Sequence, residues 1–230
     1  MHANNLRREF RMKNKLVSYS DAVSKIHDGA TIMVGGFMNV GTPVDIIEEM
    51  LKTDVKNLTI ICNDAGYPDT GVGKLINAGK VDTLIATHIG LNPVAGKLMG
   101  EEKLKVELVP QGTLAEQIRA GGFGLGGFLT QTGIGTMVQE GKDVITVDGV
   151  DYLLEKPLKA DFALILGETV DKRGNTEYSK TTRNFNPLMA TAADTVLVQA
   201  KNLVEIGELD PENVVTPHVF VDYIVGGDAS

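Results

Sequence analysis

Tryptophan is absent from this 230-residue chain, aromatic residues make up only 5 %, and Cys62 is the single cysteine. Few rings are therefore available for stacking nucleic-acid bases, and the net charge of −8 argues against a surface that binds nucleic acid. One cysteine cannot form an internal disulfide, which favours a reducing, cytoplasmic compartment. No apolar run approaches the roughly 18–20 residues of a membrane-spanning helix. We expect neither nucleic acid nor a membrane as a partner.

The composition that is present, 43 % hydrophobic and 23 % charged residues, is typical of a globular protein. A chain of this length supports one sizeable domain or two small ones. The N-terminus differs, because four basic residues between positions 7 and 13 are opposed only by Glu9. No apolar segment of the secretory type follows them. We predict that residues 1–14 are disordered or an extension, and that residues 15–230 form a single domain.

Short apolar stretches alternate with helical patterns through the first half of the chain. We predict strands at 30–34, 58–62, 81–87 and 105–109. Helices are expected at 20–27 with Ser20 as the cap, at 43–51, at 74–78, and at 113–120 with Thr113 and Glu116 as a capping box. Alternation at this spacing favours βαβ units, and therefore an α/β fold with an open, mostly parallel sheet and flanking helices.

The second half contains a different signal. Asp148-Gly149 separates two strand-like stretches, 144–147 and 150–154, and this dipeptide is typical of a tight β-hairpin. Such a hairpin would be an excursion from a parallel sheet. The strand pattern resumes at 162–166, 195–199 and 219–225, with a helix opened by Asn186-Pro187.

A glycine-rich turn joins the first predicted strand to a helix. Thr42 suits the N-cap and Pro43 the first helical position. Free backbone N–H groups in the turn, together with a helix N-terminus, would attract an anion. Because Thr42 stands where a phosphate-binding loop carries lysine, the pattern argues against a nucleotide hydrolase.

Gln111 follows a predicted strand end and precedes a helix, which is where open α/β sheets bind their ligands. Its amide could donate a hydrogen bond to a developing oxyanion, although spacing alone favours a solvent-facing glutamine. The match to G-x-G-x-x-G at Gly122–Gly127 follows a helix instead of a strand, so we expect an active-site loop or structural glycines there, and no dinucleotide site. The four histidines are scattered without the spacing of metal ligands, so we expect no metal.

Three segments resemble conserved blocks of the alpha subunits of family I coenzyme A transferases. The first block is carried by Asp28-Gly29, three apolar residues, Gly35-Gly36-Phe37, Gly41 and Pro43. The second and third blocks match residues 110–136 and 183–187, so the resemblance extends over about residues 15–225. Within the family, the chain is most similar to the bacterial acetate/butyrate–acetoacetate group.

The resemblance implies the coenzyme A transferase fold and ping-pong transfer of CoA between a short-chain acyl-CoA and a free carboxylate. The glutamate nucleophile would belong to a beta subunit in an α₂β₂ or larger assembly, because this chain lacks the Ser-Glu-Asn-Gly motif. Gln111 would lie at the acyl oxyanion. The implied CoA contacts are Gly35, Gly36, Phe37, Met38, Asn39, Val40 and Gly41. CoA would be a substrate, with no permanently bound cofactor. The alternatives are a sugar-phosphate isomerase of related fold and a non-catalytic acyl-CoA-binding protein.

Overall fold

The structure, a computed structural model, describes residues 14–227. The extension predicted for residues 1–14 thus lies almost wholly outside the described residues. The main sheet contains β1 (Thr31–Val34), β2 (Leu58–Cys62), β3 (Val81–Ala86), β4 (Lys105–Leu108), β8 (Ala160–Asp171), β9 (Thr176–Glu177), β10 (Ala193–Val204) and β11 (Tyr223–Gly226). The helices are α2 (Tyr19–Val23), α3 (Val44–Leu51), α4 (Val72–Asn77), α5 (Pro93–Gly100), α6 (Gln111–Gly122) and α7 (Asn186–Met189).

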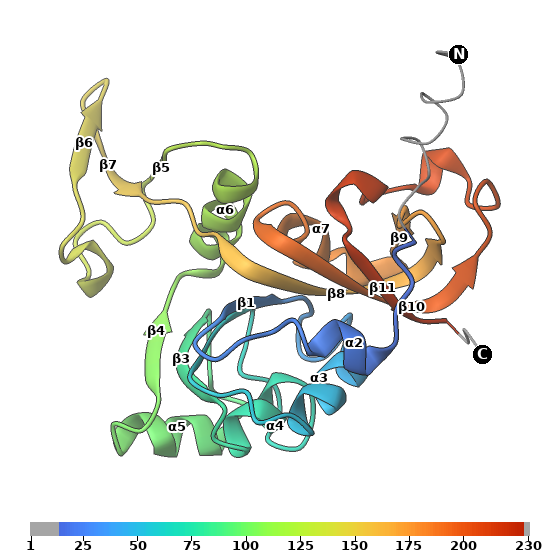
Figure 1. Ribbon diagram of the computed structural model, residues 1–230. Coiled ribbons are helices and arrows are strands. Elements are labelled where there is room, and N and C mark those ends of the chain that lie inside the picture. The colour runs from blue at the N-terminus through green and yellow to red at the C-terminus, as the bar shows by residue number, and fades with distance from the viewer. Residues whose placement is uncertain (1–13, 228–230) are drawn as a thin grey trace, which may run out of the picture.

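The strand order of the main sheet is β11-β10-β8-β1-β2-β3-β4, and each of these neighbours pairs in parallel. Only β9 is antiparallel, to β8. This confirms the predicted open, mostly parallel α/β sheet. The chain runs outward from β1 to β4 and then returns to β8 on the other side of β1 (Figure 1). A ligand crevice is expected at the carboxyl ends of β1 and β8, because the strand order reverses there.

Helices cover both faces of the sheet, with α2 to α5 on one side and α6 and α7 on the other (Figure 1). Successive residues of β1 point to opposite faces, as strand geometry requires. Ile32 packs with the buried residues of α2 to α5, whereas Met33 packs with Leu114 of α6 and Met189 of α7. Continuous burial of the central strands explains why they appear in the sequence as unbroken apolar runs.

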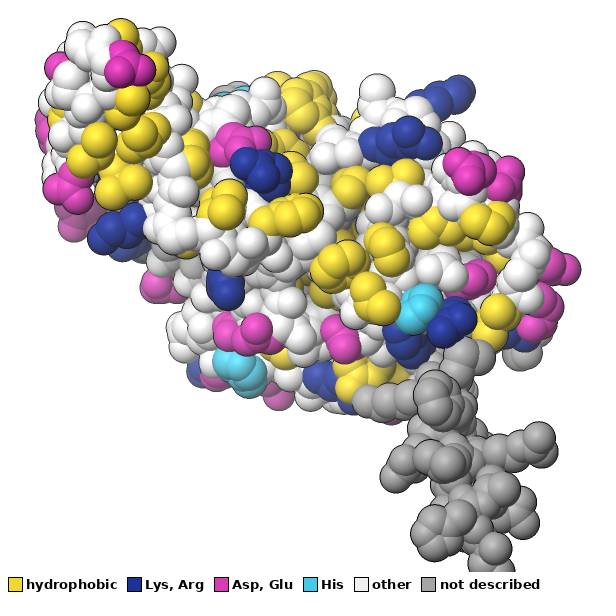
Figure 2. All heavy atoms as spheres, turned by 90° about the horizontal axis from the view of Figure 1, so that it is seen from above, with side chains coloured by type: hydrophobic (Ala, Val, Ile, Leu, Met, Phe, Trp, Pro, Cys, Tyr) yellow, Lys and Arg dark blue, Asp and Glu magenta, His cyan; other side chains and the backbone are white. Residues whose placement is uncertain are grey.

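A small antiparallel lobe projects from this body. It consists of β5 (Phe128–Thr130), β6 (Val144–Val147) and β7 (Val150–Glu155) in the order β5-β7-β6. Asp148 and Gly149 have φ angles of 53° and 77°, which is the left-handed pair that a tight hairpin turn needs. The predicted hairpin excursion is confirmed. Apolar side chains lie exposed on this lobe, which is the projection at the upper left of Figure 2.

Several predicted element boundaries were wrong, for local reasons. The cap of α2 is Ser18, whose side chain accepts a hydrogen bond from the Asp21 N–H at 3.1 Å, so Ser20 lies inside the helix. Thr113 forms no capping box, because α6 already begins at Gln111. The last strand begins only at Tyr223, since His218–Phe220 form a 3₁₀ turn.

Helix α5 is not among the predicted helices, although its start has ordinary sequence signals. Asn92 is its N-cap and accepts a hydrogen bond from the Ala95 N–H at 3.1 Å, and Pro93 is the first helical residue. An asparagine followed by proline is a recognised helix start. The α/β alternation is therefore complete between β3 and β4.

Candidate active site

The glycine loop leaves the carboxyl end of β1 as a tight turn. Phe37 and Val40 exchange backbone hydrogen bonds of 3.1 and 2.9 Å, and the two residues between them, Met38 and Asn39, have φ angles of 47° and 65°. Left-handed φ angles at residues other than glycine are uncommon and cluster at functional sites. Gly36, with φ 119°, bends the chain into the turn.

Several donors of the predicted anion site at this loop already have partners. The Met38 N–H donates to the Asp64 carboxylate at 2.8 Å. At the start of α3, the N–H groups of Asp45 and Ile46 donate to Oε1 of Gln199 at 3.0 and 3.3 Å. These three N–H groups are therefore not available to an anion.

The same contacts correct the predicted helix start. Pro43 occupies the N-cap position of α3 without a side-chain hydrogen bond, and Thr42 lies one residue earlier, buried beneath the loop. The amide oxygen of Gln199, supplied by β10, satisfies the helix donors instead. A cap supplied from so far along the chain leaves no local signal.

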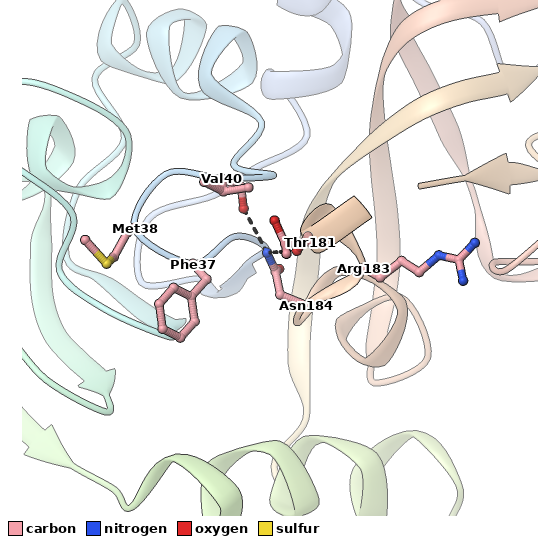
Figure 3. A pocket seen from close by; sticks show the side chains of 6 residues that line it. All are labelled: Phe37, Met38, Val40, Thr181, Arg183 and Asn184. Atoms are coloured by element: carbon pink, nitrogen blue, oxygen red, sulfur yellow. Dashed lines mark hydrogen bonds between the residues drawn. The ribbon is translucent and has the colours of Figure 1, made fainter. Parts of the chain in front are cut away.

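What the loop presents to solvent is apolar. Phe37, Met38 and Val40 are 38, 40 and 46 % exposed. Together with Thr181, Arg183 and Asn184 they line a cavity of about 680 Å³, a volume in the usual range of small-molecule sites. Phe37 and Met38 occupy one side of this space, and the Arg183 side chain extends away on the other (Figure 3).

Two asparagines from the segment after β9 hold the loop in place. The Asn184 side-chain amide donates to the Val40 carbonyl at 2.8 Å, a contact drawn in Figure 3. Asn186 is completely buried, donates to the Gly41 carbonyl at 3.0 Å, and accepts from the Leu166 N–H of β8 at 3.0 Å. Asn186 thus joins β8 to the glycine loop at the reversal of strand order. From the sequence, Asn186 is predicted only as the start of a helix.

Gln111 lies at the same carboxyl edge of the sheet, as the first residue of α6 after β4. Its side-chain amide donates to Oδ1 of Asn63 at 2.6 Å, and the Asn63 amide donates to the Asp64 carboxylate at 2.7 Å. This chain of hydrogen bonds orients the Gln111 amide and leaves its second N–H available. These hydrogen bonds end at the Asp64 carboxylate, which also accepts the hydrogen bond from the Met38 N–H.

Asn63 and Asp64 are not among the predicted site residues, although both have a usable sequence signal. They directly follow the buried strand β2, and the carboxyl ends of parallel strands lie along one edge. Asp64 accepts hydrogen bonds from three groups: the Met38 N–H, the Gly66 N–H and the Asn63 side chain. One carboxylate therefore links the glycine loop to Gln111.

Other candidates from the sequence take no part in this arrangement. Cys62 is a buried free thiol, and burial, with a further contribution from the Asp64 carboxylate, raises its pKa well above the ordinary value. Within residues 14–227, no group of three His, Cys, Asp or Glu side chains could hold a metal ion. Gly122–Gly127 run from the end of α6 toward β5, so they do not follow a strand. None of the described helices is long and apolar enough to cross a membrane.

Comparison with known proteins gives a consistent result. A profile of the coenzyme A transferase family matches residues 16–227. The acetoacetyl-CoA:acetate/butyrate CoA transferase alpha subunit of Clostridium acetobutylicum is 53 % identical over 93 % of this chain and 98 % of its own length. The acetate CoA-transferase subunit alpha of Escherichia coli K12 is also 53 % identical, with 93 % and 97 % of the two chains covered.

Solved structures share the fold. The acyl-CoA transferase of Escherichia coli O157:H7, in a thioester complex with CoA, superimposes with a TM-score of 0.82 at 25 % identity. The match covers 93 % of this chain but only 47 % of that one, so this chain spans about half of that protein. Glutaconate coenzyme A-transferase of Acidaminococcus fermentans gives a TM-score of 0.80 at 20 % identity, with 92 % and 75 % of the two chains covered.

Proposed function

Because the chain belongs to the coenzyme A transferase family, we propose that it is the alpha subunit of a heteromeric enzyme that transfers CoA between a short-chain acyl-CoA and a free carboxylate. Acetate, butyrate and acetoacetate are the proposed acids, because two relatives of 53 % identity carry acetate, butyrate or acetoacetyl in their names. We also propose that residues 15–230 form one alpha-subunit domain that acts in the cytoplasm, where a free thiol such as that of Cys62 is common.

The observation that carries the proposal is the fixed amide of Gln111 beside the glycine loop. Attack on a thioester carbonyl places negative charge on its oxygen, and a pre-oriented donor stabilises that charge. Asn63 holds the Gln111 amide at 2.6 Å before any substrate binds. Gln111 would donate its remaining N–H to the acyl oxygen.

The nucleophile is proposed to come from a beta subunit. Among residues 14–227, no acidic residue lines the cavity of about 680 Å³ at the glycine loop or the cavity that begins at Gln111, and the nearby Asp64 carboxylate already accepts three hydrogen bonds within the protein. In the proposed cycle, the partner's glutamate carboxylate attacks the thioester carbonyl carbon and releases CoA thiolate, which leaves an acyl-glutamyl anhydride. The thiolate then attacks the glutamyl carbonyl carbon, forming a glutamyl-CoA thioester and releasing the first acid. The acceptor carboxylate reverses both steps.

Coenzyme A itself is proposed to lie along the glycine loop, Gly35–Gly41, as a substrate and not as a permanently bound cofactor. Because the exposed surface of the loop is largely apolar, the contact would be made mainly by the side chains of Phe37, Met38 and Val40. Arg183, which lines the same cavity, is the side chain suited to a phosphate group.

Two other functions are less well supported by the site. A sugar-phosphate isomerase would need an anion site, and the N–H groups of Met38, Asp45 and Ile46, which could contribute to one, are already hydrogen-bonded. A non-catalytic acyl-CoA-binding protein would bind its ligand without turnover, whereas Gln111 is held as a donor beside a cavity.

The test is an assay of CoA transfer from acetoacetyl-CoA to acetate, using the chain alone and the chain mixed with a beta-type partner. We expect activity only in the mixture. Activity of the chain alone would place the nucleophile in this subunit. Binding of acyl-CoA by the mixture without turnover would instead indicate the non-catalytic alternative.

A further inference from the structure

A second cavity, of about 380 Å³, begins at Gln111. Unlike the cavity of about 680 Å³ at the glycine loop, it is not lined by Met38 or Val40. It lies between α6 and α7, which supply Ala115 and Leu188 to its lining, and Phe37 of the glycine loop bounds it as well. Ala115 is four residues after Gln111 on α6, so the two side chains lie on the same face of the helix, about 5–6 Å apart.

The lining of this cavity has a polar end and an apolar body. No lining residue is ionisable, and the polar side chains are those of Gln111 and Asn184. The Asn184 amide donates to the carbonyls of Val40 and Thr181, while its oxygen accepts from the Phe185 N–H at 2.6 Å. Its polar atoms are therefore used within the protein, and Gln111 remains as the polar group available to a ligand.

We infer that this groove holds the acyl chain of the substrate, with the thioester oxygen at Gln111 and the chain running toward Ala115 and Leu188. This inference rests on the function proposed above. One helical turn, about 5–6 Å, accommodates roughly four carbon atoms joined by bonds of about 1.5 Å. Ala115 and Leu188 therefore set the length of acid that the enzyme accepts.

The groove also determines the charge of the accepted acid. A second carboxylate at the far end of a dicarboxylic acid would lose its hydration among Ala115, Phe185 and Leu188, with no cation in the lining to compensate. Unbranched monocarboxylic acids of up to about four carbons are thus the substrate class.

The test measures kcat/KM for acetate, butyrate, hexanoate and succinate as acceptors, with acetoacetyl-CoA as the donor and the assembled enzyme. In a ping-pong cycle this ratio reports only the half-reaction of the acid. Ala115→Leu should lower kcat/KM for butyrate at least ~10-fold while changing that for acetate less than ~3-fold, since one or two methylenes in a pocket are worth about 10–200-fold. Leu188→Ala should raise kcat/KM for hexanoate, relative to kcat/KM for butyrate, about 10-fold.

The matched control is Ala78→Leu, an exposed alanine at the end of α4 on the opposite side of the sheet, which should leave all four ratios unchanged. If both groove variants change kcat/KM equally for all four acids, or change it for none, the assignment of the groove is wrong although the enzyme is a transferase. A kcat/KM for succinate as high as that for butyrate in the wild-type enzyme would also overturn the assignment. Absence of any CoA transfer by the wild-type mixture would instead reject the proposed function.

Discussion

At the scale of single residues, the candidate site depends on a few buried polar side chains with several partners each. Asp64 binds the glycine loop through Met38 and orients Gln111 through Asn63. A carboxylate that accepts three hydrogen bonds remains well satisfied although it is buried. The orientation of the candidate oxyanion donor and the shape of the loop are therefore coupled through one group.

Replacement of Gln111 by alanine should lower kcat of the assembled enzyme by ~10² or more, because it removes the oxyanion donor. Because Gln111 is exposed, water can replace its amide at Oδ1 of Asn63, and the melting temperature should change little. Steady-state kinetics with acetoacetyl-CoA and acetate would measure the effect. Gln131→Ala, an exposed glutamine of the lobe, is the matched control. An unchanged kcat at normal assembly would remove Gln111 from the mechanism.

Gly36→Val should weaken CoA binding while the subunits still associate. A Cβ at Gly36 would lie 2.0 Å from Oγ1 of Thr42, and the φ of 119° is unfavourable for any other residue. The loop must therefore shift, and we expect the affinity to fall about tenfold, equivalent to about 1.4 kcal/mol. Calorimetric titration of the assembled enzyme with CoA would measure the change.

The control for that variant is Gly96→Val in α5, where an added Cβ meets nothing within 4 Å. This control should bind CoA like the wild type. Equal affinities for the Gly36 variant and the control would contradict the assignment of the loop as a CoA contact.

At the scale of elements, α7 serves mainly to place Asn186. The helix has only four residues, and its first side chain joins β8, the glycine loop and the preceding 3₁₀ turn through Leu166, Gly41 and Thr182. Gly35 also fits against this side chain, because a Cβ there would lie 1.9 Å from Asn186 Oδ1. The loop and the strand beside it are thus packed around one amide.

Asn186→Ala should destabilise the protein by about 3 kcal/mol, because it leaves buried backbone groups without partners. The midpoint of urea unfolding should fall accordingly. Asn213→Ala, at an exposed position in the 3₁₀ turn Pro211–Asn213, is the control and should change the midpoint little. A loss of stability no larger than in the control would show that the Asn186 contacts are dispensable.

At the scale of the whole molecule, the body and the lobe differ in burial. The central strands β1, β2 and β8 are covered on both faces, whereas every residue of β6 is exposed. Glu155 ties the lobe to the body, since it accepts hydrogen bonds from Lys142 of the lobe at 2.6 Å and from Gln117 of α6 at 3.0 Å. The lobe therefore rests on few contacts.

Amide hydrogen exchange of the isolated chain should follow this division. We expect the slowest exchange in β1, β2 and β8, and exchange at least ~10²-fold faster in β6 and β7, because protection follows burial and local contact. Mass spectrometry of peptic fragments would resolve the two regions. Equal protection of the lobe and the central strands would show that the lobe does not open independently.

The amino-acid sequence by itself determined the features that depend on neighbouring residues. Apolar runs predicted the central strands, Asp148-Gly149 predicted the hairpin, and the segment after β4 predicted that Gln111 lies at the carboxyl edge of the sheet, where the structure has it. Strand periodicity and turn chemistry are local properties, and a local pattern is enough to read them.

Only the tertiary structure decided which polar groups are free. Gln199 caps α3 from 154 residues away, and Asn186 holds Gly41 from 145 residues away. For the same reason, N–H groups that look free in the glycine motif and at the start of α3, those of Met38, Asp45 and Ile46, already have partners. The groove beside Gln111 likewise exists only because α6 and α7 pack together on one face of the sheet. Hydrogen-bond satisfaction and cavity shape depend on residues that meet only after folding, and a local sequence pattern carries no record of them.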